Sequence, residues 1–162
     1  MKRLILMRHA KSDWKHGTAD VARPLNGRGR RSAQAMGLWL HDVGYIPDEI
    51  LCSSAARTRE TLEHLAMAAP TCYRKSLYLA EADSLLADLR GCSGDCVLLV
   101  GHNPGIADLA HVLVAQAPNH ERWEDYPTCA TLVTDFDIDT WADLRPGTGQ
   151  LVDFAVGRDL TD

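Results

Sequence analysis

A run of apolar residues near the start of the chain, 4–7, leads directly into an arginine and a histidine, Arg8 and His9. A short continuous apolar run is typical of a β-strand buried on both faces of a sheet. Because a guanidinium and an imidazole are costly to bury without partners, we expect Arg8 and His9 where this strand emerges, at its carboxyl end. Ligands of open α/β sheets bind at that edge. Arg8 can bind an anion there through two hydrogen bonds, and His9 can act as a nucleophile or base.

A second strand end repeats this arrangement. The run 96–100 is the clearest buried strand in the chain, and it continues into Gly101, His102, Asn103, Pro104 and Gly105. Apolar residues then recur at helical spacing over 106–114. The pattern therefore places a second histidine, His102, where a buried strand turns into a helix, which matches the position of His9.

The remaining apolar patterns complete an alternation of strands and helices. Besides the runs 4–7 and 96–100, strands are predicted at 49–52, 76–80, 131–136 and 150–156, and helices at 27–43, 55–69, 82–89 and 106–114. Asn26 is expected to cap the first helix and Gly44 to end it. This alternation predicts an α/β fold with a largely parallel sheet, in which the last two strands, joined without a helix, pair antiparallel.

The start of the second predicted helix contains a conflict between local rules. Ser53 and Ser54 are suitable caps, but Arg57 and Arg59 then fall in the first turn, where the helix dipole disfavours cations. An anion bound at this helix start would remove the conflict. Such conflicts often mark functional sites.

Length and charge limit the class of protein. The 162 residues suit one domain, 1–162, and the net charge of −5 argues against a general nucleic-acid binder while leaving room for a local basic pocket. No apolar stretch approaches the roughly 20 residues of a membrane span, and the first run is shorter than the roughly 7–15 residues of a signal-peptide core. The five cysteines show no zinc-site spacing and are expected to be reduced and mostly buried. We therefore expect a cytoplasmic protein without a membrane partner and without a metal or other cofactor.

Two histidines and at least two arginines at one sheet edge suit a tetrahedral oxyanion. Arginines match phosphoryl oxygens in charge and in fork geometry. One histidine can attack phosphorus, and the other, protonated, can stabilise the charge on the equatorial oxygens.

These residues belong to four motifs that follow one another along the chain. The motifs are Met7-Arg8-His9-Ala10, Arg23-Pro24-Leu25, Ser53-Ser54-Ala55-Ala56-Arg57-Thr58 and Gly101-His102-Asn103-Pro104-Gly105. Together they resemble the histidine phosphatase superfamily, and within it the small SixA-type phosphohistidine phosphatases, over roughly residues 1–156. The resemblance implies a phosphoglycerate mutase-like, three-layer α/β/α sandwich with a mostly parallel central sheet.

The resemblance also implies roles for particular residues. His9 matches the phosphorylated nucleophile, Arg8 and Arg57 match the arginines that bind the phosphoryl group, and His102 matches the histidine that completes the pocket. Arg23 matches the SixA-type arginine before Pro-Leu and is a further substrate-binding residue. The implied partner is a protein carrying phosphohistidine or a small phosphorylated substrate, and no metal is involved.

The chain departs from the wider superfamily in two ways. Ala10 follows the Arg-His pair where many members have glycine, which fits the SixA-like subset. The chain is also too short for the large insertion that supplies a general acid in other members. Glu81 is the candidate acid, although it equally suits an ordinary helix start, and Asp13 and Asp20 are weaker candidates. Four further histidines are interpreted as surface or hydrogen-bonded residues: His16, His64, His111 and His120.

Other functions are compatible with only part of this pattern. A cysteine-dependent phosphatase needs five residues between cysteine and arginine, but Arg57 follows Cys52 after four residues and Arg59 after six. A phosphosugar mutase is disfavoured because a short chain has little with which to shield a phosphorylated intermediate from water. A small-molecule phosphomonoesterase of the same superfamily and a non-catalytic phosphate-binding module remain as alternatives.

Overall fold

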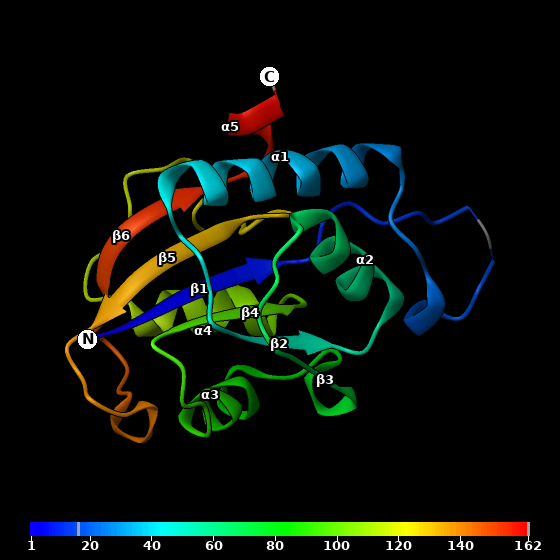
Figure 1. Cartoon of the computed structure of the whole chain (residues 1–162). Helices are drawn as coiled ribbons and strands as arrows, with labels where there is room; N and C mark the ends of the chain where they lie inside the picture. The colour runs from blue at the N-terminus through cyan, green and yellow to red at the C-terminus, as the bar shows by residue number, and fades with distance from the viewer. Residues whose placement is uncertain (16, 162) are drawn as a thin grey trace.

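The chain forms a six-stranded sheet in the order β3-β2-β4-β1-β5-β6, as the computed structural model, which describes residues 1–15 and 17–161, shows (Figure 1). The strands are β1 (Lys2–Arg8), β2 (Glu49–Ser53), β3 (Thr71–Arg74), β4 (Cys96–Gly101), β5 (Thr131–Phe136) and β6 (Gln150–Ala155). The first four strands of that order are parallel, whereas β5 pairs antiparallel with both β1 and β6. The predictions of a mostly parallel sheet and an antiparallel final pair are confirmed.

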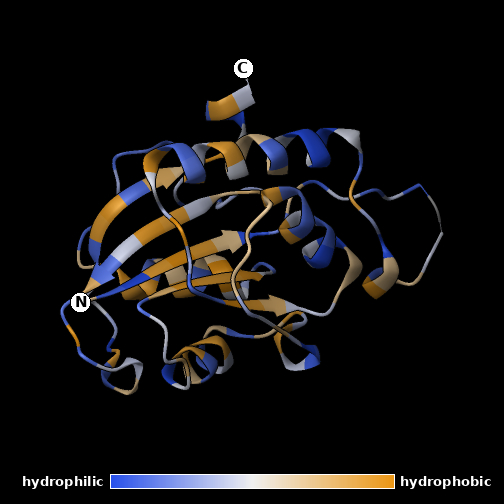
Figure 2. Ribbon diagram, viewed as in Figure 1, coloured by the Kyte–Doolittle hydropathy of each residue, from blue (hydrophilic) through white to orange (hydrophobic). Residues whose placement is uncertain are grey.

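Helices cover both faces of the sheet (Figure 1). They are α1 (Gly27–Val43), α2 (Ala56–Leu65), α3 (Ala82–Arg90), α4 (Gly105–Leu113) and α5 (Gly157–Thr161), with short 3-10 turns η1 (Asp20–Ala22), η2 (Lys75–Leu77) and η3 (Trp141–Asp143). Alternate residues of β1 enter opposite clusters: Leu4 and Leu6 pack with α3 and α4, whereas Ile5 and Met7 pack with α1 and α2. The apolar colouring of the strands in Figure 2 follows this two-sided burial. The expected three-layer α/β/α architecture is confirmed.

The start of α1 is locked to the loop that follows β1. The Asn26 side chain caps the helix by accepting a 2.8 Å hydrogen bond from the Gly29 backbone amide. The backbone amide of Asn26 donates to the Lys11 carbonyl at 3.0 Å. A Cβ atom at Gly29 would overlap the same Lys11 carbonyl, so only glycine fits there. Gly44 ends the helix with φ +87°, as predicted.

Some local predictions were wrong. The strand expected at 76–80 is replaced by β3 and η2; β3 is a largely exposed edge strand and therefore lacks an apolar pattern. The N-cap of α2 is Ala55, which has no side-chain cap bond, because Ser53 still belongs to β2; the helix ends at Leu65. The short helix α5 was not predicted. All five cysteines are free, but only Cys52 and Cys129 are buried.

Across residues 1–15 and 17–161, no helix combines the length and apolar character that crossing a membrane requires.

Candidate active site

The two strand-end histidines meet at one edge of the sheet. β1 and β4 are neighbouring parallel strands in which Arg8 pairs with Gly101. The next residue of each strand is a histidine, and the ring centroids of His9 and His102 lie 5.4 Å apart. Register alone therefore brings together two imidazoles that are far apart in the sequence.

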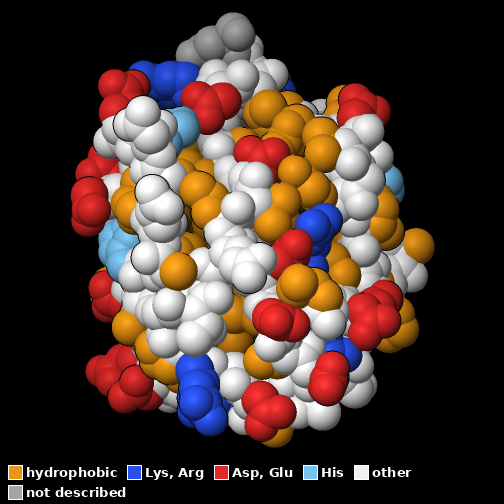
Figure 3. All heavy atoms as spheres, turned by 90° about the vertical axis from the view of Figure 1, so that its left-hand side faces the viewer, with side chains coloured by type: hydrophobic (Ala, Val, Ile, Leu, Met, Phe, Trp, Pro, Cys, Tyr) orange, Lys and Arg blue, Asp and Glu red, His pale blue; other side chains and the backbone are white. Residues whose placement is uncertain are grey.

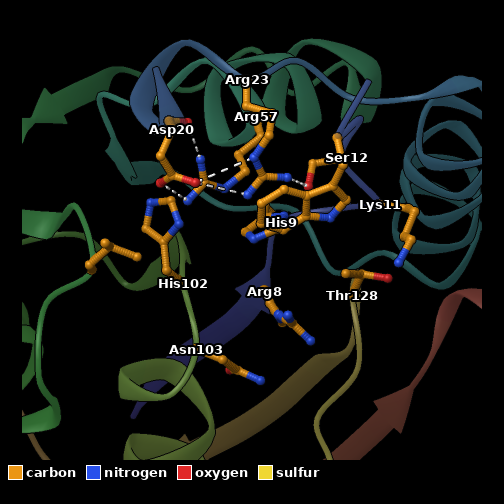
Figure 4. Close-up of a pocket in the computed structure, with 12 residues that line it drawn as sticks. Arg8, His9, Lys11, Ser12, Asp20, Arg23, Arg57, His102, Asn103 and Thr128 are labelled. Atoms are coloured by element: carbon orange, nitrogen blue, oxygen red, sulfur yellow. Dashed lines mark hydrogen bonds and ion pairs between the residues drawn. The ribbon is translucent and has the colours of Figure 1, made fainter. Parts of the chain in front are cut away.

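A cavity of about 350 Å³ opens at this edge, and five predicted site residues line it: Arg8, His9, Arg23, Arg57 and His102 (Figure 4). They come from β1, the loop before α1, the first turn of α2, and the end of β4. We call this cavity the phosphoryl pocket.

The acidic residue Asp20 ties two of the arginines together. Arg57 donates to the Asp20 carbonyl at 2.7 Å and to its carboxylate at 3.0 Å. Arg23 donates to the other carboxylate oxygen at 3.1 Å and 3.3 Å, and also to the Ser12 hydroxyl. The Tyr78 hydroxyl donates to the same carboxylate, and with the arginines it lowers the pKa of Asp20 to about 2. Asp20 is thus an ionised group that holds the guanidiniums in place.

Arg8 points to another side of the pocket, toward Asn103 and Thr128 (Figure 4). Its Nη1 donates weakly to the Tyr126 carbonyl at 3.4 Å, and the Asn103 amide donates to the same oxygen at 2.9 Å. Burial, and then the charge of Arg57, lower the pKa of Arg8. An anion bound in the pocket would offset this repulsion between like charges.

Three buried side-chain atoms in the described part of the chain have no hydrogen-bond partner: Arg8 Nε, Arg57 Nε and His102 Nδ1. All three belong to residues that line the phosphoryl pocket. Because native proteins pair almost all buried polar atoms, such exceptions indicate where a polar ligand binds.

His9 is held as a neutral imidazole with one free nitrogen. Its Nδ1 lies 2.7 Å from the Ala10 carbonyl, and since a carbonyl only accepts, Nδ1 carries the hydrogen. Burial, with smaller contributions from His102 and the arginines, lowers the pKa of His9 to about 3. The lone pair on Nε2 is therefore available at neutral pH, as a nucleophile requires.

His102 is oriented by Ser53, whose hydroxyl lies 2.8 Å from its Nε2. Burial and the charge of Arg57 lower the pKa of His102 to about 4. The expectation of a protonated second histidine is therefore wrong for the free pocket, because burial, and then the charge of the arginines, disfavours the charged imidazole.

The candidate acids lie in different places. Glu81 is exposed at the N-cap of α3 and borders a separate cavity of about 310 Å³, so the structure does not bring it into the phosphoryl pocket. Asp13 does not line the pocket either, whereas Asp20 does. Cys52 is buried, and burial raises the pKa of its thiol to about 12, which argues against the cysteine-dependent alternative.

Sequence reasoning missed two supporting residues. Ser53 was interpreted as a helix cap but orients His102, and Tyr78, expected in a strand, contacts Asp20 and lies edge-on to the His102 ring. The position of Ser53 at the end of an apolar run was the signal in the sequence; that β2 lies beside β4 is known only from the structure.

The other described histidines have partners outside the phosphoryl pocket: His41 on the Ala66 carbonyl, His64 beside Glu60, His111 on the Trp123 carbonyl and His120 on Asp159. His16 lies outside the described residues.

Within residues 1–15 and 17–161, no three His, Cys, Asp or Glu side chains are grouped so as to hold a metal ion.

Comparisons with known proteins agree with this geometry. The family model of the histidine phosphatase superfamily (branch 1) matches residues 4–84. An uncharacterized protein of Mycobacterium tuberculosis is 39% identical over 159 residues, which cover 94% of this chain and 100% of that protein.

Solved structures similar to this one include two candidate phosphohistidine phosphatases SixA. The protein from Nakamurella multipartitia is 31% identical with a TM-score of 0.83 over 95% of both chains. The protein from Agrobacterium tumefaciens is 27% identical with a TM-score of 0.77, over 96% of this chain and 97% of that one. With its motifs and fold, the chain belongs to the histidine phosphatase superfamily, is of the SixA type, and is a phosphatase.

Proposed function

We propose that this phosphatase removes the phosphoryl group from phosphohistidine on a protein, through a covalent phospho-His9 intermediate. One observation carries the proposal: a buried, neutral His9 with a free Nε2 shares a cavity with three arginines. The cavity thus combines a nucleophile with groups that bind the phosphoryl oxygens.

The reaction would run in two displacements at phosphorus. Arg8 and Arg57 bind the phosphoryl oxygens, and Nε2 of His9 attacks phosphorus while the bond to the substrate nitrogen breaks. The Ala10 carbonyl, which accepts from Nδ1, then stabilises the positive charge that His9 acquires. Water next attacks phosphorus, the bond to His9 breaks, and inorganic phosphate leaves.

The leaving group favours phosphohistidine over alkyl phosphates. An alkoxide, whose conjugate acid has a pKa near that of water, about 15.7, needs a proton in the transition state. The imidazole of a phosphohistidine that is protonated on its other ring nitrogen leaves as a neutral group, whose conjugate acid has a pKa of about 6.5, so it needs no proton from the protein. Asp20, with its pKa lowered to about 2, is a poor proton donor, and Glu81 lies in another cavity.

The rim of the pocket suits a protein substrate. Trp14 is 73% exposed and Leu79 is 52% exposed, and both line the pocket. Trp14 stacks on the guanidinium of Arg23, with 3.5 Å from Cζ to the ring centroid, which fixes the aromatic ring at the edge of the site. Exposed, rigid aromatic residues are typical contact points between proteins.

The proposal is tested with a histidine-phosphorylated protein and a panel of alkyl and aryl phosphomonoesters. We expect kcat/KM for phosphohistidine to exceed that for alkyl esters by at least about 100-fold, the lower range of what a general acid contributes. Faster turnover of alkyl esters would indicate a small-molecule phosphomonoesterase. Stoichiometric binding of phosphate without turnover of any substrate would indicate a binding module.

A further inference from the structure

A second cavity, of about 210 Å³, adjoins the phosphoryl pocket. It is lined by four basic side chains, from Lys11, Arg28, Arg122 and Arg158, and no carboxylate of the described residues lines it. We call it the basic pocket. Lys11 and Thr128 belong to the linings of both cavities, and in Figure 4 both lie across the phosphoryl pocket from His102. A ligand that fills the phosphoryl pocket can therefore continue into the basic pocket.

The backbone holds these cations beside the catalytic edge. The Lys11 carbonyl accepts from the Asn26 amide, and the close approach of Gly29 to it places Arg28 next to Lys11. On the opposite wall, the Cys129 amide donates to the carbonyls of Arg8 and His9 at 3.1 Å and 3.0 Å, which fixes the neighbouring Thr128. Backbone hydrogen bonds thus connect Lys11 to the start of α1, and Cys129, the neighbour of Thr128, to the end of β1.

Two of the four cations, Arg28 and Arg122, have little charge compensation. Arg28 is exposed, and no hydrogen bond or ion pair of its side chain is found among the described residues. Arg122 has an exposed partner in Asp125 at 3.0 Å, and surface pairs of this kind are weak. The chain as a whole carries −5, and the far end of the sheet shows scattered Asp and Glu side chains (Figure 3). A local positive cavity on an acidic protein is a site for an anion.

We propose that the basic pocket is a second anion subsite, which binds the carboxylate of an acidic residue close to the phosphohistidine of the substrate protein. The inference rests on the proposed function and adds to it a substrate preference. Arginine forks match a carboxylate in geometry, and the exposed rim at Trp14 and Leu79 lets a protein surface approach. A second phosphate on a small substrate has the same chemistry, so the test separates the two sources.

The test uses two histidine-phosphorylated peptides, one with Asp and Glu beside the phosphohistidine and one with Asn and Gln. We expect the enzyme to prefer the acidic peptide. Arg28→Gln should raise KM for that peptide by about 2- to 5-fold, the range of a single exposed charge pair, and leave the neutral peptide unchanged. The Arg28→Gln/Arg122→Gln variant should lose more, and added salt should abolish the preference.

Arg145→Gln is the matched control, because it removes the same charge from an exposed residue after η3, away from both pockets. It should behave as the parent enzyme.

The outcomes separate the two proposals. Equal turnover of both peptides, or equal effects of Arg28→Gln on both, would overturn the subsite while leaving the proposed function intact. Turnover of neither peptide would overturn the proposed function. An Arg28-dependent preference for small bisphosphates over monophosphates, without a preference between the peptides, would reassign the subsite to a small substrate and also overturn the inference.

Discussion

Two neighbouring cavities share Leu79 in their walls but carry opposite charge. The phosphoryl pocket is lined by arginines, with one carboxylate, that of Asp20, bonded to two of them. The other cavity is lined by carboxylates, and no Lys or Arg of the described chain borders it; its acidic residues are Glu81, Asp83 and Asp108.

The charge of a cavity determines whether its carboxylates can donate a proton. A carboxylate beside the arginines is held ionised, as the lowered pKa of Asp20 shows, so it stabilises cations and does not donate a proton. The carboxylates of the other cavity do not line the phosphoryl pocket. The pocket is therefore built to hold a charged phosphoryl group and not to protonate a leaving group.

Replacing the nucleophile of the phosphoryl pocket should have the largest effect. His9→Ala should abolish the acid-labile, base-stable phosphoenzyme seen by rapid quench and reduce kcat by on the order of 10⁴-fold or more, the scale for loss of a nucleophile. His64→Ala, outside the pocket, is the control. Accumulation of the same phosphoenzyme in His9→Ala would show that another residue is the nucleophile.

Removing the arginines should have the next largest effect. Arg8→Ala and Arg57→Ala each remove a charge-assisted contact and should lower kcat by about 10²- to 10³-fold. Because we propose that both bind one phosphoryl group, the double variant should lose much less than the product of the two. Arg59→Ala is the control, since Arg59 lies in the same helix turn but stacks on Tyr73, at 4.0 Å. Fully multiplicative losses would mean that the two arginines act on different groups.

His9, His102 and Arg57 could be predicted from the sequence for a physical reason. His9 and His102 directly follow buried apolar runs, and Arg57 stands in a helix turn that disfavours it, so each leaves a local signal. Asp20 lines the pocket from η1, and Tyr78, directly after η2, contacts Asp20; both segments are too short to show an apolar pattern. The pairing of Ser53 with His102 depends on β2 lying beside β4, a sheet order that local patterns do not contain.

Neutralising the one carboxylate of the phosphoryl pocket should increase its affinity for anions. Asp20→Asn removes the ionised partner of Arg23 and Arg57, so inorganic phosphate should bind more tightly, with an inhibition constant lowered by about 5- to 10-fold, equivalent to roughly 1–1.4 kcal/mol. Asp13→Asn, at a carboxylate that does not line the pocket, is the control. Weaker phosphate binding would show that the positioning of the arginines by Asp20 outweighs its competition with phosphate for their charge.

The neutral histidines predict a pH dependence of stability. In the unfolded chain a histidine titrates near 6.5, whereas His9 and His102 titrate at about 3 and 4 in the fold. Between these values the unfolded chain binds more protons, so stability is lost as the pH falls from about 6.5 toward 4. His9→Gln should therefore show a smaller fall in Tm between pH 7 and pH 5 than the parent, measured by thermal unfolding. An identical fall in both proteins would contradict a buried, neutral His9.

The smallest expected effect concerns the acidic cavity. Glu81→Gln should slow phosphohistidine cleavage by less than about tenfold, because the departing imidazole needs no strong acid and Glu81 does not line the phosphoryl pocket. Alkyl phosphates should remain poor substrates for parent and variant alike. If Glu81 instead serves as a general acid, the parent should cleave alkyl phosphates well and the variant should lose about 10²- to 10⁴-fold on them. Asp83→Asn, at another carboxylate of the same cavity, is the matched control, and it separates a specific proton donor from a general change of charge beside the pocket. Efficient alkyl phosphate turnover that depends on Glu81 but not on Asp83 would mean that the two cavities act as one site. The substrate would then be a small phosphomonoester.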